Sequence, residues 1–199
     1  MDPDSMILLA VLLLMVVMSG YFSATETAFT SLNRIRLKSR AENGDKKAEK
    51  TLALAEDYDK LLSTILIGNN IVNNVAATLS TLLFIDLIGQ ADGPAVSTIV
   101  LTVVVLIFGE ISPKSLAKES PEAFAMFSAP LLRLFMAVLT PLNFLFGLWK
   151  KLLTKLFHRE QDEGITDEEL VTIVAEAEDQ GGLDKEESQL IRSAIRFDN

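Results

Sequence analysis

The sequence predicts an all-α membrane protein: three transmembrane helices, a juxtamembrane bent helical hairpin and a cytoplasmic acidic helical hairpin. The chain is 49% hydrophobic with a mean hydropathy of +0.32, too apolar for an ordinary soluble domain. Its apolar blocks are long enough to cross a bilayer as helices. The last residues are acidic with helical periodicity. We expect a transmembrane domain over residues 1–157 and a cytoplasmic acidic helical bundle over residues 165–199.

The first span is expected over residues 6–32, with a kink at Ser19-Gly20. Asp2 and Asp4 precede it, whereas a secretory signal carries Lys or Arg there. A basic cluster follows the span: Arg34, Arg36, Lys38, Arg40, Lys46, Lys47 and Lys50. By the positive-inside rule this segment is cytoplasmic and the N-terminus lies outside.

The second span, residues 61–88, runs outward, and the third, residues 96–116, runs back inward. The turn between them holds Asp92 and no basic residue, as an outer loop should. Within the basic segment, Asn43-Gly44-Asp45 predicts a turn between two short helices.

Residues 121–157 allow two interpretations. They are apolar enough for a fourth span, but Pro130 and Pro141 interrupt the helix and Arg133 sits in the middle. Lysines flank the segment on both sides, and both flanks favour the cytoplasm. We therefore expect juxtamembrane helices that pack around the bundle or lie at the inner interface. A true fourth span would have to place one basic cluster outside.

The C-terminal residues predict two acidic helices after a charged linker over residues 159–164. Thr166 and Glu169 form a capping box for the first helix, and Asp184 can cap the second. This hairpin cannot bury both faces alone, so we expect it to pack on a partner or a missing domain. The sequence stops at Asn199 without an evident ending, which indicates a truncated chain.

The stretch FGEISPK, residues 108–114, places a carboxylate, Glu110, within a membrane span. Such a residue is costly in lipid and therefore suggests a function. Pro113 cannot donate to the carbonyl four residues earlier, on Gly109, so that oxygen is freed. Carboxylate and carbonyl oxygens suit Mg²⁺, Ca²⁺ or Na⁺. The alternative is a kinked helix whose Glu110 is protonated or paired with Lys114.

Polar residues occur in all three spans. They are Ser19, Ser23, Thr25 and Glu26 in the first, Asn69, Asn70, Asn73 and Asn74 in the second, and Glu110 and Ser112 in the third. Helical rise places Ser23, Asn69 and Glu110 roughly 16, 13 and 12 Å from the cytoplasmic ends, so they lie at similar heights. Interhelical hydrogen bonding explains any single Asn. The whole cluster favours a cavity that surrounds one cation.

Other functions are disfavoured. The chain has no cysteine and one histidine, His158, which argues against thiolate or histidine zinc sites and a Ser-His-Asp triad. No basic patch with interleaved aromatic residues indicates nucleic acid. No phosphate loop or cofactor fingerprint indicates an enzyme.

The motifs SGYFSATETAFTSLN, ILIGNNIVNN and FGEISPK, followed by the acidic hairpin, resemble the CNNM/CorC family of magnesium transporters. The resemblance implies a homodimer in the plasma (inner) membrane, in contact with the lipid bilayer. In this family a pair of CBS modules that bind ATP-Mg²⁺ normally follows, and this chain lacks them.

The resemblance further implies Na⁺-coupled Mg²⁺ efflux by alternating access, with a largely dehydrated Mg²⁺ between the spans. Its ligands would be Ser23, Asn69, Asn73, the Gly109 carbonyl and Glu110, with Pro113 as the kink. Around them would lie Ser19, Glu26, Asn70, Asn74 and Ser112, and which Asn pair faces the ion stays open. One alternative is a membrane-anchored Mg²⁺ sensor or regulatory subunit that binds without transporting. Another is a scaffold whose polar residues only join helices.

Overall fold

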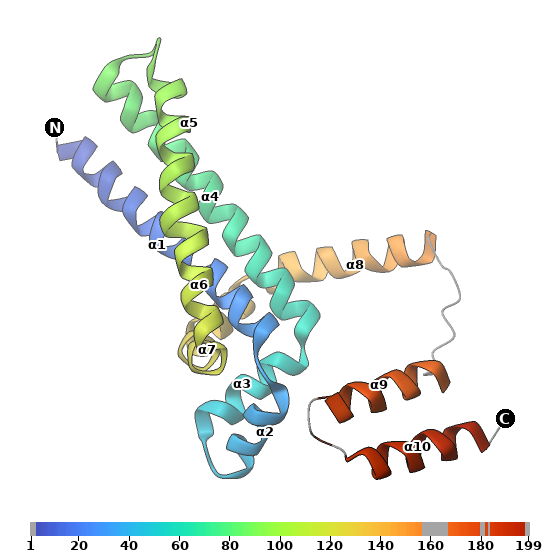
Figure 1. Cartoon of the computed structure of the whole chain (residues 1–199). Coiled ribbons are helices and arrows are strands. Elements are labelled where there is room, and N and C mark those ends of the chain that lie inside the picture. The colour runs from blue at the N-terminus through green and yellow to red at the C-terminus, as the bar shows by residue number, and fades with distance from the viewer. Residues whose placement is uncertain (1–2, 157–166, 180–181, 183, 198–199) are drawn as a thin grey trace. The chain divides into compact units, whose positions relative to one another are not determined.

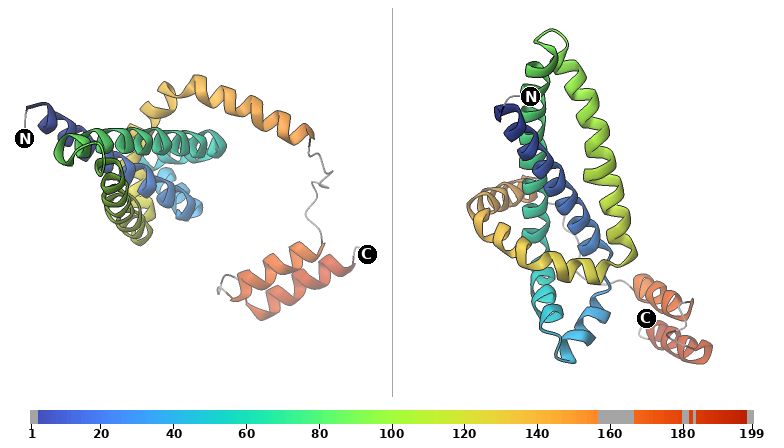
Figure 2. Two further views of the ribbon diagram at one scale, coloured as in Figure 1. Left: turned by 90° about the horizontal axis from the view of Figure 1, so that it is seen from above. Right: turned by 90° about the vertical axis from the view of Figure 1, so that its left-hand side faces the viewer.

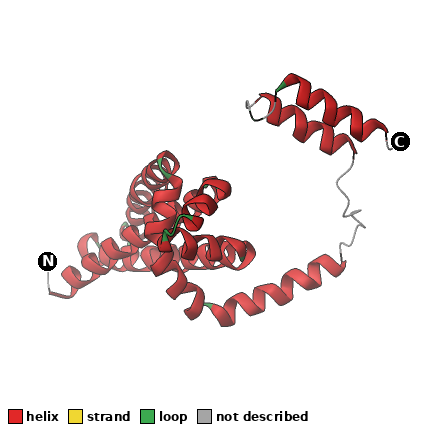
Figure 3. Ribbon diagram, turned by 90° about the horizontal axis from the view of Figure 1, so that it is seen from below, coloured by secondary structure: helices red, strands yellow, loops and turns green. Residues whose placement is uncertain are grey.

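The computed structural model describes residues 3–156, 167–179, 182 and 184–197, and all elements in these ranges are helices (Figures 1 and 3). The all-α prediction is therefore confirmed. The chain divides into two compact units, Met1–Leu152 and Leu153–Asn199, which are described separately.

Three long helical segments form the first unit and lie side by side (Figures 1 and 2). They are α1 (Pro3–Ser31), α4 (Tyr58–Ile88) and a segment composed of α5 (Gly93–Val104), η1 (Val105–Ile111) and α6 (Ser112–Glu119). With 29, 31 and 27 residues they are roughly 40–46 Å long, enough to cross a bilayer. They occur where the three spans are expected. The helix α1 is continuous through Ser19-Gly20.

The centre of the bundle is an aromatic cluster packed against a glycine. Phe22 on α1 is 1% exposed, and its ring centroid lies 5.0 Å from that of Phe135 and 5.4 Å from that of Tyr21. A Cβ on Gly68 of α4 would lie 2.4 Å from the Phe22 ring, so only glycine fits there without a shift. Tyr21 Oη donates to the Ser128 carbonyl at 2.9 Å, which ties α7 (Pro121–Val138) to α1.

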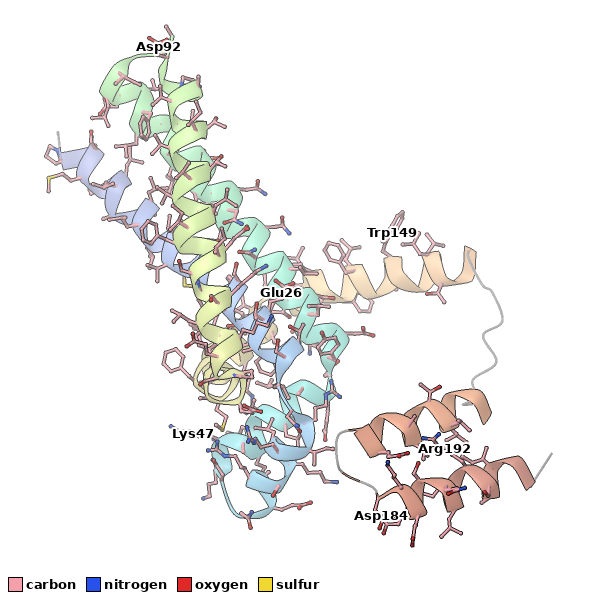
Figure 4. All side chains as sticks on the ribbon, in the orientation of Figure 1. Glu26, Lys47, Asp92, Trp149, Asp184 and Arg192 are labelled. Carbon is pink, nitrogen blue, oxygen red and sulfur yellow. The ribbon has the colours of Figure 1, made fainter. Side chains whose placement is uncertain are left out.

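The end of the bundle that carries Asp92 is a tight hairpin between α4 and α5 (Figure 4). Gly89 ends α4 with a φ of 91°, a conformation that favours glycine. A buried hydrogen bond of 2.8 Å joins Ser97 Oγ to Ser80 Oγ across the hairpin. Ser5 at the start of α1 donates to the Asp86 carboxylate. These polar contacts hold the three helices in register at this end.

At the opposite end lie two short helices, α2 (Arg34–Glu42) and α3 (Lys46–Glu56), the latter with Lys47 (Figure 4). The predicted turn between them is confirmed, and Gly44 adopts a φ of 90° in it. Asp45 caps α3 by accepting from the Lys47 and Ala48 backbone N–H groups at 3.0 and 3.2 Å. The Ala48 N–H and the Arg40 guanidinium hold the pKa of the Asp45 carboxyl below its usual range.

By length and composition four helices in the described residues could cross a membrane, and the fourth is α7 (Pro121–Val138). Its direction differs from that of the other three: α7 and the following α8 (Thr140–Leu156) run across the bundle instead of along it (Figures 1 and 2). Asn143 Nδ2 on α8 donates to Thr64 Oγ1 on α4 at 2.8 Å. This arrangement favours the juxtamembrane interpretation over a fourth span.

The second unit contains the hairpin of α9 (Asp167–Asp179) and α10 (Lys185–Phe197). The predicted Asp184 cap is confirmed and reciprocal: Glu187 N–H donates to Asp184 Oδ1 at 2.8 Å, and Asp184 N–H to Glu187 Oε2 at 3.1 Å. Arg192 and Ser188 both donate to Glu178, at 2.9 and 2.6 Å, and so join the two helices. The expected linker 159–164 and the Thr166 cap lie outside the described residues.

We expect the Gly68→Ala substitution to destabilise the bundle by about 1–3 kcal/mol, because the added methyl group overlaps the Phe22 ring. Thermal unfolding in detergent measures this. Gly147→Ala is the matched control, since no atom lies within 4 Å of its Cβ position. Phe22→Leu in the Gly68→Ala background should recover part of the loss. Equal melting temperatures for the two glycine variants would contradict this packing.

The lowered pKa of Asp45 predicts a pH dependence of the α2–α3 turn. The carboxylate stabilises the turn fully above the pKa of an unfolded aspartate, and this contribution is lost as pH falls through the lower folded value. NMR titration of the side-chain carboxyl in micelles should give a pKa that rises in Arg40→Gln. Lys38→Gln removes a nearby charge without touching Asp45 and should leave that pKa unchanged.

Candidate cation site

Ser19 is the point at which the three long helices meet. Its side chain is fully buried on α1, and its Oγ donates to Asn69 Oδ1 on α4 at 3.4 Å. A Cβ on Gly109 of η1 would lie 3.0 Å from Ser19 Oγ. Ser19 was expected only to surround the site, but it lies at the contact between Asn69 and Gly109.

One residue further on, Gly20 allows the third segment to approach α1 closely. A Cβ on Gly20 would lie 3.0 Å from the Phe108 carbonyl oxygen and 3.1 Å from Pro113 Cγ. Neither a backbone oxygen nor a proline ring can rotate away. Gly20 therefore serves a close approach of two helices, in addition to any effect on the direction of α1.

The third segment changes from an α-helix to a π-helix over Val105–Ile111, a change that the sequence pattern does not predict. Its bundle-facing positions are four residues apart: Leu101, Val105, Gly109, Pro113 and Ala117 are all buried or half-buried. In an α-helix four residues rotate about 40° beyond one full turn, so residues at this spacing would gradually move away from a single face. The wider π-turn offsets part of that drift and keeps them towards α1 and α4.

The π-helix also changes which carbonyl loses its donor. The Ser112 N–H bonds to the Ile107 carbonyl, five residues back. The Phe108 carbonyl therefore loses its α-helical donor, and its π-helical donor would be Pro113, which has no N–H. The Gly109 carbonyl likewise receives nothing from Pro113. The expectation of one freed oxygen at Gly109 thus extends to Phe108, whose oxygen faces Gly20.

Two buried oxygens near this contact have no hydrogen-bond partner among the described residues. They are Ser23 Oγ on α1 and Asn73 Oδ1 on α4. Ser23 lies one turn beyond Ser19, and Asn73 one turn beyond Asn69. Because α1 and α4 are antiparallel, these two residues lie on opposite sides of the Ser19–Asn69 contact, each displaced by roughly 6 Å. The predicted ligands therefore follow the helix axis over about two turns.

The four asparagines of α4 separate into two pairs. Asn69 and Asn73 are half-buried towards the bundle, whereas Asn70 and Asn74 are exposed. Asn70 Nδ2 donates to the Leu66 carbonyl of its own helix at 2.8 Å. Ser112, also expected near the site, is exposed. The geometry therefore favours the pair Asn69 and Asn73.

The charged residues are arranged differently from the simple alternative in which Glu110 pairs with Lys114. Lys114 Nζ instead lies 3.6 Å from Glu26 Oε2 on α1. Glu110 is half-buried beside Gly109 and forms no ion pair within the described part of the chain. Glu26 is thus the partner of Lys114, and the Glu110 carboxylate remains available to a cation.

The site offers one carboxylate and several neutral oxygens. Among the described residues no three His, Cys, Asp or Glu side chains gather as a metal-binding group. Carboxylate, hydroxyl, amide and carbonyl oxygens are hard ligands, which suit Mg²⁺ or Na⁺ better than zinc or copper. Each of the two unpartnered oxygens fits contact with such an ion, because the ion would supply the interaction that the oxygen lacks.

Residues 8–187 match the family model described as the cyclin M transmembrane N-terminal domain, CNNM. The chain is 39% identical over 173 residues to a UPF0053 protein of Haemophilus influenzae, covering 85% of this chain and 41% of that protein. It is 39% identical over 166 residues to the UPF0053 inner membrane protein YfjD of Escherichia coli, covering 81% and 39%. The chain thus spans about two fifths of the length of these relatives.

We expect a double-mutant cycle between Glu26→Gln and Lys114→Gln to give a coupling energy of up to about 1 kcal/mol, since both side chains are partly exposed. Thermal unfolding in detergent is the measurement. The matched cycle between Glu110→Gln and Lys114→Gln should give a coupling near zero. A larger coupling in the second cycle would refute the assignment of Lys114 to Glu26.

Proposed function

The chain belongs to the CNNM family, and from this premise we propose that it is the membrane domain of a Mg²⁺ transporter. We propose further that Mg²⁺ binds between the three long helices, largely dehydrated, and leaves the cell by alternating access coupled to Na⁺ entry. In this proposal the chain acts as a homodimer in the inner membrane, with its N-terminus outside and its C-terminus in the cytoplasm.

The observation that carries the proposal is the pair of buried, unpartnered oxygens, Ser23 Oγ and Asn73 Oδ1. A buried polar atom without a partner costs about 1–3 kcal/mol. The cost is harder to offset in a membrane, where no bulk water reaches the helix interior. The half-buried Glu110 directly follows Gly109, which contacts Ser19, and supplies negative charge. Because the two oxygens lie on opposite sides of the Ser19–Asn69 contact, a cation that moves along the helix axis contacts them one after the other.

The three-helix contact also supports a transport role over simple adhesion of helices. If the asparagines only joined helices, their oxygens would be paired across the interface. The Asn69 oxygen is paired, at the long distance of 3.4 Å, but the Asn73 oxygen is not. With Glu110 as the single carboxylate, a bound Mg²⁺ keeps part of its charge uncompensated, which favours release as well as binding.

The arrangement of charges supports the proposed orientation. The end with α2 and α3 carries the basic cluster, and the opposite end carries Asp92 (Figure 4). Asp86 lies at that end too, where it accepts from Ser5 at the start of α1. Basic residues gather on the cytoplasmic side of membrane proteins. The exposed apolar side chains of α1, α4 and α5 fit contact with lipid or with a second copy of the chain.

We expect Glu110→Gln and Asn73→Ala to lower Mg²⁺ flux into liposomes by about tenfold or more, because a hydrogen bond or ligand contact to a charged group is worth about 1.5–3 kcal/mol. A Mg²⁺-sensitive dye inside the liposomes measures flux. Asn74→Ala is the matched control, since Asn74 is exposed on α4. Wild-type flux in purified, folded Glu110→Gln protein would overturn the proposal.

Thermal unfolding with millimolar Mg²⁺, combined with the flux measurement, distinguishes transport from the sensor and the scaffold. A ligand that binds only the folded state raises its stability. Transport predicts stabilisation of the wild type, weaker stabilisation of Glu110→Gln, and flux in the wild type alone. Stabilisation without flux would identify a membrane-anchored sensor, and no stabilisation would leave the polar residues as helix-joining groups.

A further inference from the structure

A second site lies away from the three-helix contact, between α3 and α7. It is a cavity of about 230 Å³ that combines three cationic and four apolar side chains. Its lining residues are Lys47, Lys50, Leu54, Met126, Ala129, Pro130 and Arg133. The lining contains no carboxylate, and its three cations are solvent-exposed.

The helix α7 has three distinct faces, and one of them lines this cavity. Residues Ala125, Leu132 and Met136 form a buried face towards the bundle. The residues Phe127, Leu134 and Val138 form an exposed apolar face, with 75%, 58% and 63% of their surface accessible. Met126, Pro130 and Arg133 lie on a third face, towards α3. An amphipathic helix with such an apolar face lies in the membrane interface, which places the cavity at the level of the lipid headgroups.

The cations of the cavity, like the exposed Lys38 and Lys46, form no ion pair within the described residues. Arg36 pairs with Glu122, Arg40 with Asp45 and Lys114 with Glu26. Within the described part of the chain, by contrast, no carboxylate forms an ion pair with Lys47, Lys50 or Arg133. Their positive charge is therefore available to an anion from outside the protein.

From this geometry we propose that the α3–α7 cavity binds the phosphate headgroup of an acidic phospholipid. Arg133, Lys47 and Lys50 bind the phosphate, since guanidinium and ammonium groups donate charge-assisted hydrogen bonds to phosphate oxygens. Leu54, Met126 and Pro130 contact the glycerol and the first acyl carbons. Basic cavities beside membrane helices on the cytoplasmic side are suited to such headgroups.

A lipid fits the cavity better than a soluble phosphate for two reasons. The apolar half of the lining would stay in contact with water if only a small anion were bound. The exposed apolar face of α7 is continuous with the membrane in the proposed arrangement, so an acyl chain can leave the cavity directly into lipid. The site is independent of the proposed cation site, and its test does not measure flux.

The test is native mass spectrometry of the full chain in mixed micelles that contain phosphatidylglycerol or phosphatidylcholine. We expect one phosphatidylglycerol to be retained by the wild type. The double variant Lys47→Gln/Arg133→Gln should lower the apparent lipid affinity about tenfold or more, because each basic residue near a membrane surface contributes about 1 kcal/mol. Lys38→Gln/Lys46→Gln is the matched control, as it removes the same charge from equally exposed positions that do not line the cavity.

Three outcomes decide the proposal. Retention of phosphatidylglycerol by the wild type and the control, with loss in the Lys47/Arg133 variant, supports it. Equal retention by both variants overturns it, because general surface charge would then explain lipid binding. If millimolar glycerol 3-phosphate stabilises the wild type against heat as much as phosphatidylglycerol does, the cavity is a soluble-anion site and the lipid assignment is wrong.

Discussion

The structure of the membrane domain depends on the close approach of α1 to the segment formed by η1 and α6. Gly20 packs against the Phe108 carbonyl and the Pro113 ring, and Gly109 packs against the Ser19 side chain. Without a hydrophobic driving force between helices in lipid, such close packing is a main source of association. The same approach brings backbone oxygens of the third segment next to the polar side chains of α1. Packing and the candidate site therefore depend on one contact.

Apolar and polar layers alternate along α1, and each has a different role. Phe22, packed on Gly68, fills space and fixes the distance between α1 and α4. Ser19 and Ser23, on either side of it in sequence, are buried as well. A well-packed aromatic cluster so close to unpartnered oxygens limits how far the helices can relax to satisfy them. This rigidity supports the proposed binding of an ion that must give up much of its water.

Much of the fold could be predicted from the sequence because a membrane permits few structures. Backbone groups in lipid must be paired internally, so apolar segments such as residues 61–88 have to be helices. The Gly44 turn and the Asp184 cap follow from local chemistry that tertiary contacts do not override. The site was predicted less completely. The central place of Ser19 and the Glu26–Lys114 pair depend on helix rotation and on the π-turn, and neither follows from hydropathy or spacing.

The π-turn at Val105–Ile111 determines where the third segment can lose a residue without rotating its two halves against each other. A π-turn corresponds to an α-helix with one inserted residue, looped into a single wide turn. Removing a residue here would restore α geometry while Leu101 and Ala117, on either side, kept their orientation towards α1 and α4. At any other point of the segment, the same deletion would rotate one half by about 100°. The bundle should therefore tolerate a single deletion best at this turn, where the deletion would leave only the carbonyl four residues before Pro113 without a donor.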